Sequence, residues 1–496
     1  MEVLNQSNLE TYFQEFRENI IGNNSMISLP NGEQKRIVYT DWTASGRMYK
    51  EIEEKLIHEV YPFVANTHTD TNSTGQALTH AYHFAQNIIK KHVNADGNDV
   101  IITADSGMTG VINKLQRILG FKVHERFKAK IQLEECDIPI VFITHMEHHS
   151  NQTSWLETIA EVEVIQPNSN GNPDLNHLNE LLAKYSKRKV KIASVTAASN
   201  VTGIQVDYHG IAEVMHVNDG LCFVDFACAA PYVNIDMHPE NDARKLDAIF
   251  FSPHKFLGGP GTSGVLIFNK QLYTNSIPDH PGGGTVNWTN PWKEHSYIDA
   301  IEEREDGGTP GFLQTIRTAL CIRLKDKMTV EKMLEREEEL KEIVFNYFDQ
   351  IPNLHLLANE NRDNRLGIFS FYIDGLHFNK VVKLLNDKYG VQTRGGCSCA
   401  GTYGHYLLNI DFDLSHALVH EISSGNCSNK PGWVRMSIHP TMTNQDMIFV
   451  CESIKDIATN YEFYLEAYNF SPATGKITRK DENGISDRMV ESWFEI

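Results

Sequence analysis

A lysine stands in a short polar turn between two apolar runs of the sequence. The turn reads Ser252-Pro253-His254-Lys255, and the runs 247–251 and 264–268 have the length and composition of buried strands. We therefore expect Lys255 to be partly buried, which lowers the pKa of an ammonium group and leaves an amine that can attack an aldehyde. Gly258-Gly259 would let the backbone approach a bulky group. An ordinary surface lysine in a hairpin is the alternative.

An aspartate ends another apolar run. Leu221-Cys222-Phe223-Val224-Asp225 reads as a buried strand, so the Asp225 carboxylate needs a partner. A heterocyclic nitrogen is one such partner, because a carboxylate keeps it protonated and makes the ring an electron sink. A helix N-cap is the common alternative. The chain between Asp225 and Lys255 is long enough for one helix and one strand.

Two cysteines stand close together in Arg394-Gly395-Gly396-Cys397-Ser398-Cys399. A thiolate is a strong nucleophile, and a nearby cation such as Arg394 or His148 would help a thiol to ionise. Structural thiols, a redox pair and half of a metal site are the alternatives. No second Cys-x-x-Cys or His pair stands at a matching spacing in the sequence, so we expect no metal site.

Composition limits the classes of protein to which the chain can belong. It has 496 residues, of which 41% are hydrophobic, so it can bury the cores of two or three lobes. Its net charge of −19 argues against nucleic acid as a partner, because phosphate backbones need clustered Lys and Arg. The sequence shows neither a secretory signal nor an apolar run of membrane-spanning length. We expect a cytoplasmic protein that binds a small molecule and does not enter a membrane.

Apolar runs of strand length alternate with helix-like stretches in the first part of the chain. Nearly continuous Val, Ile and Phe indicate strands buried on both faces, and the alternation with helices predicts an α/β domain with a mostly parallel sheet. Active sites in such sheets lie at the carboxyl ends of strands. The runs are 99–103, 138–144, 191–195, 221–225, 248–251 and 264–268.

The pattern changes after residue 311, where a smaller α+β domain is expected. A charged helical stretch is predicted at 319–350, a strand at 366–372 and a helix near 379–388. The tail 472–496 is polar and reads as an appendage. We expect three regions, namely an N-terminal segment at 1–40 that packs with the small domain, a large domain at 41–311, and a small C-terminal domain with the cysteine loop at 312–496.

In this order the segments resemble the class V, fold-type I enzymes that depend on pyridoxal 5′-phosphate (PLP), and most of all the cysteine desulfurases and selenocysteine lyases. The resemblance runs from Tyr39 to about Ile454. It implies that PLP is the cofactor, held as an imine on Lys255 with its pyridine nitrogen at Asp225. It also implies a large PLP-binding domain with a mixed, mostly parallel sheet and a smaller α+β C-terminal domain.

Further residues match the family's cofactor site, although each has an ordinary structural alternative such as a helix cap. Gly107, Met108 and Thr109, after Ser106, resemble the turn at a helix start that cradles the phosphate. His148, in Met146-Glu147-His148-His149, matches the histidine that stacks on the ring. The resemblance places Asn200 at the ring hydroxyl and the substrate, Ser252 and His254 at the phosphate, and Thr309 at the phosphate of the neighbouring subunit in a homodimer with shared active sites.

The substrate side of the site is implied in the same way. Arg435, in Trp433-Val434-Arg435, matches the arginine that clamps the carboxylate of an amino-acid substrate, and we expect Arg394 and Asn200 beside it. The segments 39–46 and 66–68 resemble two active-site loops. One position departs from the family, because Cys228 stands where Gln or His usually bonds the ring hydroxyl, and a thiol is a weak donor.

The cysteine loop carries the Arg-x-Gly-x-x-Cys-Ala pattern of the desulfurase-like enzymes, with Cys399 at the position of the nucleophile. The resemblance implies that Lys255 takes the α-proton of L-cysteine and that Cys399 attacks the substrate sulfur. The products would be L-alanine and a persulfide on Cys399, with His148 assisting. A sulfur-acceptor protein is a further expected partner. Cys397 could accept sulfur from Cys399 or form a disulfide with it.

Other readings stay open on the same scaffold. They are a selenocysteine lyase, a class V aminotransferase or epimerase acting on another amino acid, the PLP domain of a molybdenum-cofactor sulfurase, and a scaffold that binds without turnover. The sulfurase is less expected, because the chain ends soon after the small domain. The segment 403–432 is longer than in compact desulfurases and could cover the site, bind a sulfur acceptor or be a surface loop.

Overall fold

The computed structural model describes residues 8–28, 32–67, 69, 71–104, 107–480 and 487–496. Its larger sheet has seven strands in the order β4-β10-β9-β8-β7-β5-β6. Strand β10 is antiparallel to both of its neighbours, and the other pairs are parallel. This mixed, mostly parallel sheet confirms the predicted α/β fold. The strands are β4 Asp99–Ala104, β5 Ile140–Thr144, β6 Glu161–Ile165, β7 Lys191–Thr196, β8 Leu221–Asp225, β9 Ala248–Phe251 and β10 Gly264–Asn269.

The two faces of this sheet belong to two separate hydrophobic clusters. On β8, Phe223 enters one cluster, and its neighbours Cys222 and Val224 enter the other. Because helices cover both faces, nearly every position of the central strands is buried, which explains the unbroken apolar runs of the sequence. The first cluster includes α5 Met108–Ile118 and α7 His149–Leu156, and the second includes α4 Ser73–His92, α8 Leu175–Lys184, α9 Tyr208–Val217 and α11 Phe312–Met328.

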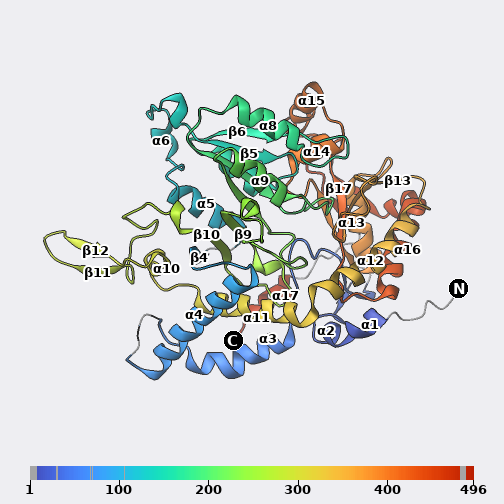
Figure 1. Cartoon of the computed structure of the whole chain (residues 1–496). Coiled ribbons are helices and arrows are strands. Elements are labelled where there is room, and N and C mark those ends of the chain that lie inside the picture. The colour runs from blue at the N-terminus through green and yellow to red at the C-terminus, as the bar shows by residue number, and fades with distance from the viewer. Residues whose placement is uncertain (1–7, 29–31, 68, 70, 105–106, 481–486) are drawn as a thin grey trace.

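A second, antiparallel sheet lies beside the first (Figure 1) and has the strand order β13-β14-β17-β16. Its strands are β13 Leu354–Leu356, β14 Ile368–Ile373, β16 Arg394–Gly396 and β17 Trp433–Ser437. Helices α12 Val330–Phe348, α13 Phe378–Leu384 and α16 Asn444–Leu465 accompany it. The part of the chain that contains the second sheet is called the smaller lobe below, and the segment 39–46 is called the early loop. Strand β3 Val38–Tyr39 pairs in parallel with β15 Val391–Gln392, so the start of the early loop is attached to the smaller lobe.

The long helix predicted at 319–350 is wrong in its bounds, because it is two helices. Helix α11 ends at Met328 and α12 begins at Val330. Between them Thr329 has a φ of +54°, which no α-helix accommodates. The predicted strand at 366–372 is β14, and the predicted helix near 379–388 is α13 followed by a π-helical turn at Leu385–Tyr389.

The first part of the tail is packed and is not the free appendage that its polarity suggested. Strands β18 Tyr468–Phe470 and β19 Ile477–Arg479 form a hairpin, and Ile477 is buried. The Asn379 side-chain amide at the start of α13 donates a 2.8 Å hydrogen bond to the Gly475 carbonyl in the hairpin turn. Residues 468–479 are therefore part of the smaller lobe.

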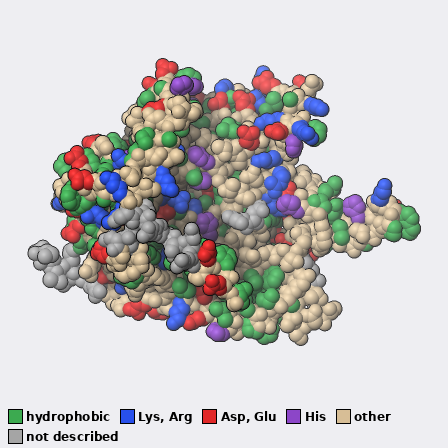
Figure 2. Space-filling view, turned by 180° about the vertical axis from the view of Figure 1, so that it is seen from behind, with side chains coloured by type: hydrophobic (Ala, Val, Ile, Leu, Met, Phe, Trp, Pro, Cys, Tyr) green, Lys and Arg blue, Asp and Glu red, His purple; other side chains and the backbone are tan. Residues whose placement is uncertain are grey.

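One hairpin projects from the body of the molecule. It is formed by β11 Val286–Thr289 and β12 His295–Tyr297 and forms an extended arm in Figures 1 and 2. Two large side chains on it, Trp288 and Trp292, are exposed. Within the described ranges, no helix is both long enough and apolar enough to span a lipid bilayer.

Candidate active site

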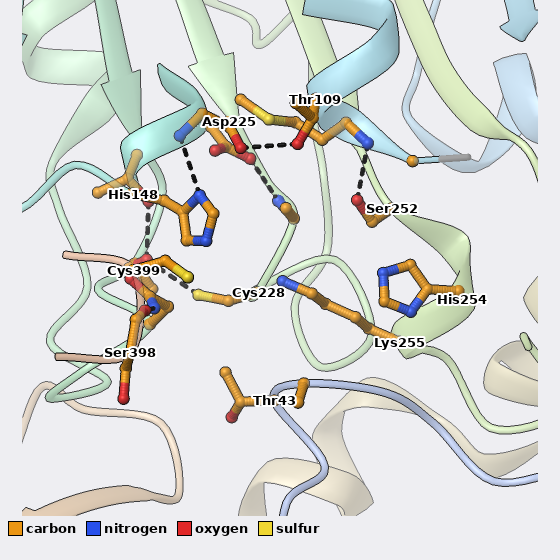
Figure 3. Close-up of a pocket in the computed structure, with 18 of the residues that line it drawn as sticks. Thr43, Thr109, His148, Asp225, Cys228, Ser252, His254, Lys255, Ser398 and Cys399 are labelled. Carbon is orange, nitrogen blue, oxygen red and sulfur yellow. Dashed lines mark hydrogen bonds between the residues drawn. The ribbon is translucent and has the colours of Figure 1, made fainter. Parts of the chain in front are cut away.

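A cavity of about 200 Å³ lies at the carboxyl edge of the larger sheet, where the loops after the strands meet the smaller lobe. Figure 3 shows side chains from both lobes pointing into it. Every residue given a catalytic, cofactor or substrate role from the sequence lines this one cavity except Thr309. The lining includes Gly107, Met108, Thr109, His148, Asn200, Asp225, Cys228, Ser252, His254, Lys255, Arg394, Cys399 and Arg435.

Lys255 extends into the cavity from the turn after β9 (Figure 3). Burial is the main reason why the pKa of its ammonium group is lowered from the ordinary value of 10.5. The early loop packs tightly on this turn, since the Gly46 backbone N–H donates a 2.9 Å hydrogen bond to the His254 carbonyl. A Cβ at Gly46 would stand 1.9 Å from the Phe256 carbonyl oxygen, so glycine is required for this approach.

Asp225 ends β8 and is buried at the floor of the cavity. Its carboxylate accepts a 2.7 Å hydrogen bond from the Ala227 backbone N–H. Burial raises the pKa of Asp225 to about 6, which the nearby Lys255 partly opposes. A carboxylate in such a place gains from a cationic partner, because its charge costs free energy while it is unpaired.

Cys228 lies three residues beyond Asp225 and faces the same cavity. Its thiol donates to the Ala198 carbonyl at 2.9 Å, and burial raises the pKa of the thiol to about 12. Cys228 is therefore a neutral donor. Cys228 stands where the family usually has Gln or His, and its neutral thiol adds no charge beside Lys255.

The N-terminus of α5 forms an anion cradle beside the lysine turn. The Met108 backbone N–H donates to Ser252 Oγ at 2.8 Å, and Thr109 Oγ1 lies 2.6 Å from Ser150 Oγ. Gly107 has a φ of +123°, which glycine adopts without strain. The N–H groups at a helix start, together with these hydroxyls, are suited to a phosphate. Ser106 lies outside the described residues.

His148 caps the start of α7 and is a neutral imidazole. Its Nδ1 accepts a 3.1 Å hydrogen bond from the Ser150 backbone N–H, and burial lowers the pKa of the ring to about 3. The neutral ring supplies no positive charge to the cysteine, which leaves Arg394, on the same cavity lining as Cys399, as the cation named from the sequence.

Three hydrogen bonds hold the cysteine loop against the larger lobe. The His149 backbone N–H donates to the Cys399 carbonyl at 2.7 Å, and the Gly401 N–H donates to His149 Nε2 at 2.9 Å. The Asn200 side-chain amide donates to the Ser398 carbonyl at 2.7 Å. The loop backbone is thus held at residues 398, 399 and 401, while the Cys399 residue is exposed.

Two arginines from neighbouring strands share one carboxylate. Asp41 accepts from Arg435 Nη2 at 2.8 Å and from Arg394 Nε at 3.1 Å. Arg435 is buried and also donates to the Asn200 carbonyl at 3.1 Å. Among the described residues, Arg435 Nε and Asn200 Oδ1 are buried without a hydrogen-bond partner. Both belong to residues that line the cavity, so a polar ligand there would satisfy groups that are costly to leave unpaired.

Some expected residues do not reach this cavity. Thr309 is exposed and does not line it. Of the loop 66–68, Asn66 is exposed, Thr67 is buried away from the lining, and His68 lies outside the described residues.

Several lining or supporting residues were missed from the sequence. Asp41 and His149 stand inside quoted motifs, but their roles depend on partners hundreds of positions away in the chain. Ser150 could have been predicted from the sequence, because it directly follows the His148-His149 motif at the start of a helix. Thr43 and Ala44 line the cavity from the segment 39–46, which was expected at the active site, and the other missed lining residues are Thr196, Ala198, Ala227 and Ser398.

A group of potential metal ligands lies elsewhere, at the start of β4. His238 Nε2 is 2.6 Å from Asp99 Oδ2, and Asp96 lies beside them. The Asp99 carboxylate also accepts from the Asp96 backbone N–H at 2.8 Å. These contacts form a hydrogen-bonded network that ties β4 to residue 238, and none of the three residues lines the cavity.

Known proteins of similar sequence include two that are named probable cysteine desulfurases. A probable cysteine desulfurase from Streptomyces coelicolor is 25% identical over 369 residues, covering 74% of this chain and 84% of that protein. One from Staphylococcus aureus is 26% identical over 370 residues, with the same two coverages of 74% and 84%.

Solved structures agree on the fold. The cysteine desulfurase CsdA from Escherichia coli superposes with a TM-score of 0.70 at 21% identity, covering 90% of this chain and 98% of that one. The cysteine desulfurase from Thermococcus onnurineus gives a TM-score of 0.69 at 20% identity, covering 86% and 95%. The resemblance and the fold predicted from the sequence are thereby confirmed. The profile of the class-V aminotransferases matches residues 38–448, most of the chain, and the protein belongs to that family.

Proposed function

We propose that this protein is a PLP-dependent cysteine desulfurase, which converts L-cysteine to L-alanine and leaves the sulfur as a persulfide on Cys399. The observation that carries the proposal is the joint placement of Lys255, Asp225 and Cys399 on one cavity. A cavity that needed only to bind a ligand would have no use for a buried lysine and an exposed thiol facing the same space. The names of the relatives support the same activity.

The residues of the cavity fit PLP. Buried Asp225, whose pKa is raised to about 6, would be stabilised as an anion by the protonated pyridine nitrogen. The start of α5 at Gly107, with Ser252 and His254, would hold the phosphate, since a Cβ at Gly107 would come within 3.1 Å of Ser252 Oγ and fill the cradle. Neutral His148 would cover one face of the ring, and Lys255 would hold the cofactor covalently.

When bound, PLP supplies an electron sink that stabilises negative charge at the substrate α-carbon. Lys255 Nζ, once released to the substrate side, would accept the α-proton. Its lowered pKa suits this role, because an amine must be unprotonated to act as a base. Arg435 would orient the substrate by binding its carboxylate through two nitrogens, and its unpartnered Nε is available for that bond.

Cys399 would then attack the substrate sulfur as a thiolate. It is exposed at the mouth of the cavity, with Arg394 on the same lining to stabilise a negative charge. The backbone bond from His149 and the side-chain bond from Asn200 would keep the loop facing the substrate. Two neighbouring residues of the loop, Ser398 and Cys399, have φ of +51° and +59°, so this orientation is held by the surrounding contacts.

The proposal includes a homodimer with shared sites. Thr309 lies in the exposed segment Gly307-Gly308-Thr309 and does not line the cavity of its own subunit. In the family that the sequence resembles, the residue at this position contacts the phosphate of the neighbouring subunit. We propose the same for Thr309, with a sulfur-acceptor protein as a further partner.

The experiment is to supply the PLP-loaded protein with L-cysteine and to measure alanine and protein-bound sulfur. Wild-type protein should release alanine and carry sulfur on Cys399. Cys399→Ser should retain the absorbance of bound PLP and lose the bound sulfur, whereas Lys255→Ala should lose both turnover and the covalent link. Release of selenide from selenocysteine, with no alanine from cysteine, would favour a selenocysteine lyase and contradict the proposal.

A further inference from the structure

A second cavity, of about 350 Å³, adjoins the first at the cysteine loop. Arg394, Ser398 and Cys399 line both cavities, so Cys399 stands where the two meet. We call the second cavity the outer groove. Three free thiols line it, those of Cys397, Cys399 and Cys427. Nothing in the desulfurase reaction described above requires Cys427.

Cys427 is held at the wall of the outer groove by the tail. It belongs to the segment 403–432 and follows helix α15 Phe412–Ser423. Its backbone N–H donates to the Pro472 carbonyl at 2.6 Å, and its thiol donates weakly to the Ala473 carbonyl at 3.4 Å. The same tail turn is fixed to α13 through Asn379 and Gly475. These contacts place a half-buried thiol at the groove, and the packed part of the tail holds it there.

The charges around the groove favour anionic sulfur. Its lining includes the cations Arg394 and Lys430 together with His377, and no carboxylate residue among the part of the lining that the structure describes. A thiol near cations ionises more readily, and a persulfide anion is stabilised in the same way.

Cys397 is less suited to sulfur transfer than Cys427. It packs against the larger hydrophobic cluster, which holds its side chain in place, whereas Cys427 belongs to neither cluster. Cys399 lines both cavities in this one conformation of the loop, so no rearrangement is needed to bring it to the outer groove.

We propose that Cys427 is a second sulfur carrier, which takes the outer sulfur of the Cys399 persulfide in the outer groove. The inference rests on the proposed function, since Cys399 must first be loaded. The Cys427 thiolate attacks the outer sulfur, the S–S bond on Cys399 breaks, and its electron pair stays on the Cys399 sulfur as a thiolate. A new S–S bond forms on Cys427. The proton lost by Cys427 passes to water or to Cys399, and neither an oxidant nor a reductant is consumed.

The consequence is that each subunit stores two sulfur atoms when no acceptor is present. The test uses the full-length, PLP-loaded protein with L-cysteine and without a thiol reductant. Alanine released in the first burst is counted per subunit, and the persulfides are alkylated and located by peptide mass spectrometry. Wild-type protein should release about two alanines and carry sulfur on Cys399 and Cys427. Cys427→Ser should release about one and carry sulfur on Cys399 alone.

Two further variants make the result specific. Cys136→Ser removes a thiol of similar exposure that lines neither cavity, and its burst should equal that of wild type. Cys399→Ser should leave Cys427 unloaded, because the sulfur arrives only through Cys399. The absorbance of bound PLP reports that each variant is folded.

Three outcomes would overturn the inference while leaving the proposed function intact. They are equal bursts from wild type and Cys427→Ser, no sulfur on the Cys427 peptide of wild type, and a burst halved by Cys397→Ser instead. Sulfur on Cys427 that persists in Cys399→Ser would also contradict the transfer. A wild-type protein that releases no alanine at all would contradict the proposed function, and this inference would fail with it.

Discussion

Arg394 and Arg435 are direct cross-strand partners on β16 and β17, and Asp41 binds both of them. Two like charges opposite each other destabilise a sheet unless an anion neutralises them. Asp41 comes from the early loop, which also packs on the turn that carries Lys255. The two arginines and Lys255 are therefore held in one framework, although more than 100 residues separate the lysine from each arginine in the chain.

Arg435→Lys should raise the KM for L-cysteine about 10- to 100-fold, because a lysine cannot replace a two-nitrogen bond to a carboxylate and such charged bonds contribute about 1.5–3 kcal/mol. The matched control is Arg394→Lys on the facing strand position, whose side chain is half exposed and which should change KM less. Steady-state kinetics of alanine release measure both. Equal KM values for the two variants would argue against Arg435 as the carboxylate ligand.

The His149 ring should act as a positioning group for the cysteine loop. His149→Ala removes the acceptor of the Gly401 N–H and should lower kcat about fivefold, the effect of about 1 kcal/mol, with little change in KM. His149→Gln offers an amide oxygen near the same place and should recover most of the rate. Absorbance of bound PLP should be the same in all three proteins. A loss of cofactor from His149→Ala, or no recovery with Gln, would speak for a merely structural role.

Features of the structure that depend on residues close together in the chain could be predicted from the sequence, and features that depend on distant segments could not. The buried strands of the larger sheet could be predicted because each is apolar along its own length, as β8 and β9 are. The break at Thr329 could not, since the residue with the positive φ is a threonine and neither glycine nor proline marks the position.

The candidate site follows the same rule. Motifs placed Lys255, Asp225 and Cys399 near one another, because each motif lies at the end of an element. Two other features could not be predicted from a local pattern, because they join distant segments of the chain. They are the pairing of Asp41 with two arginines and the contact of the tail with Cys427.

Acid should destabilise the protein through buried neutral histidines, of which His439 is the clearest. It is stacked on Trp42, its Nδ1 accepts from the Thr441 N–H, and burial lowers its pKa to about 3. An unfolded histidine binds a proton below about pH 6.5. The stability that His439 contributes should therefore be fully present above pH 6.5. Below that pH the free energy of unfolding should fall by about 1.4 kcal/mol per pH unit for this group, until the pH reaches about 3.

His439→Asn keeps an acceptor for Thr441 and removes the titration. Between pH 7.5 and 5.0, wild-type protein should lose about 2 kcal/mol more stability than the variant, measured by urea unfolding of both proteins. Parallel losses in the two proteins would mean that His439 binds its proton equally well in the folded state.

Subunit mixing should reveal whether Thr309 serves the partner's site. Thr309→Ala and Lys255→Ala homodimers should each be impaired. A heterodimer of the two, purified through different tags, should recover about half of the wild-type alanine release, since one of its sites receives an intact lysine and an intact threonine. A fully active Thr309→Ala homodimer, or a heterodimer no better than its parents, would contradict sharing.

The central claim is that Lys255 carries the cofactor, and reduction of the PLP-loaded protein with borohydride tests it most directly. Peptide mass spectrometry of the reduced protein should find the pyridoxyl group on Lys255 and on no other lysine, at about one group per subunit. A label elsewhere, or protein that stays colourless and unlabelled with PLP in excess, would contradict the account.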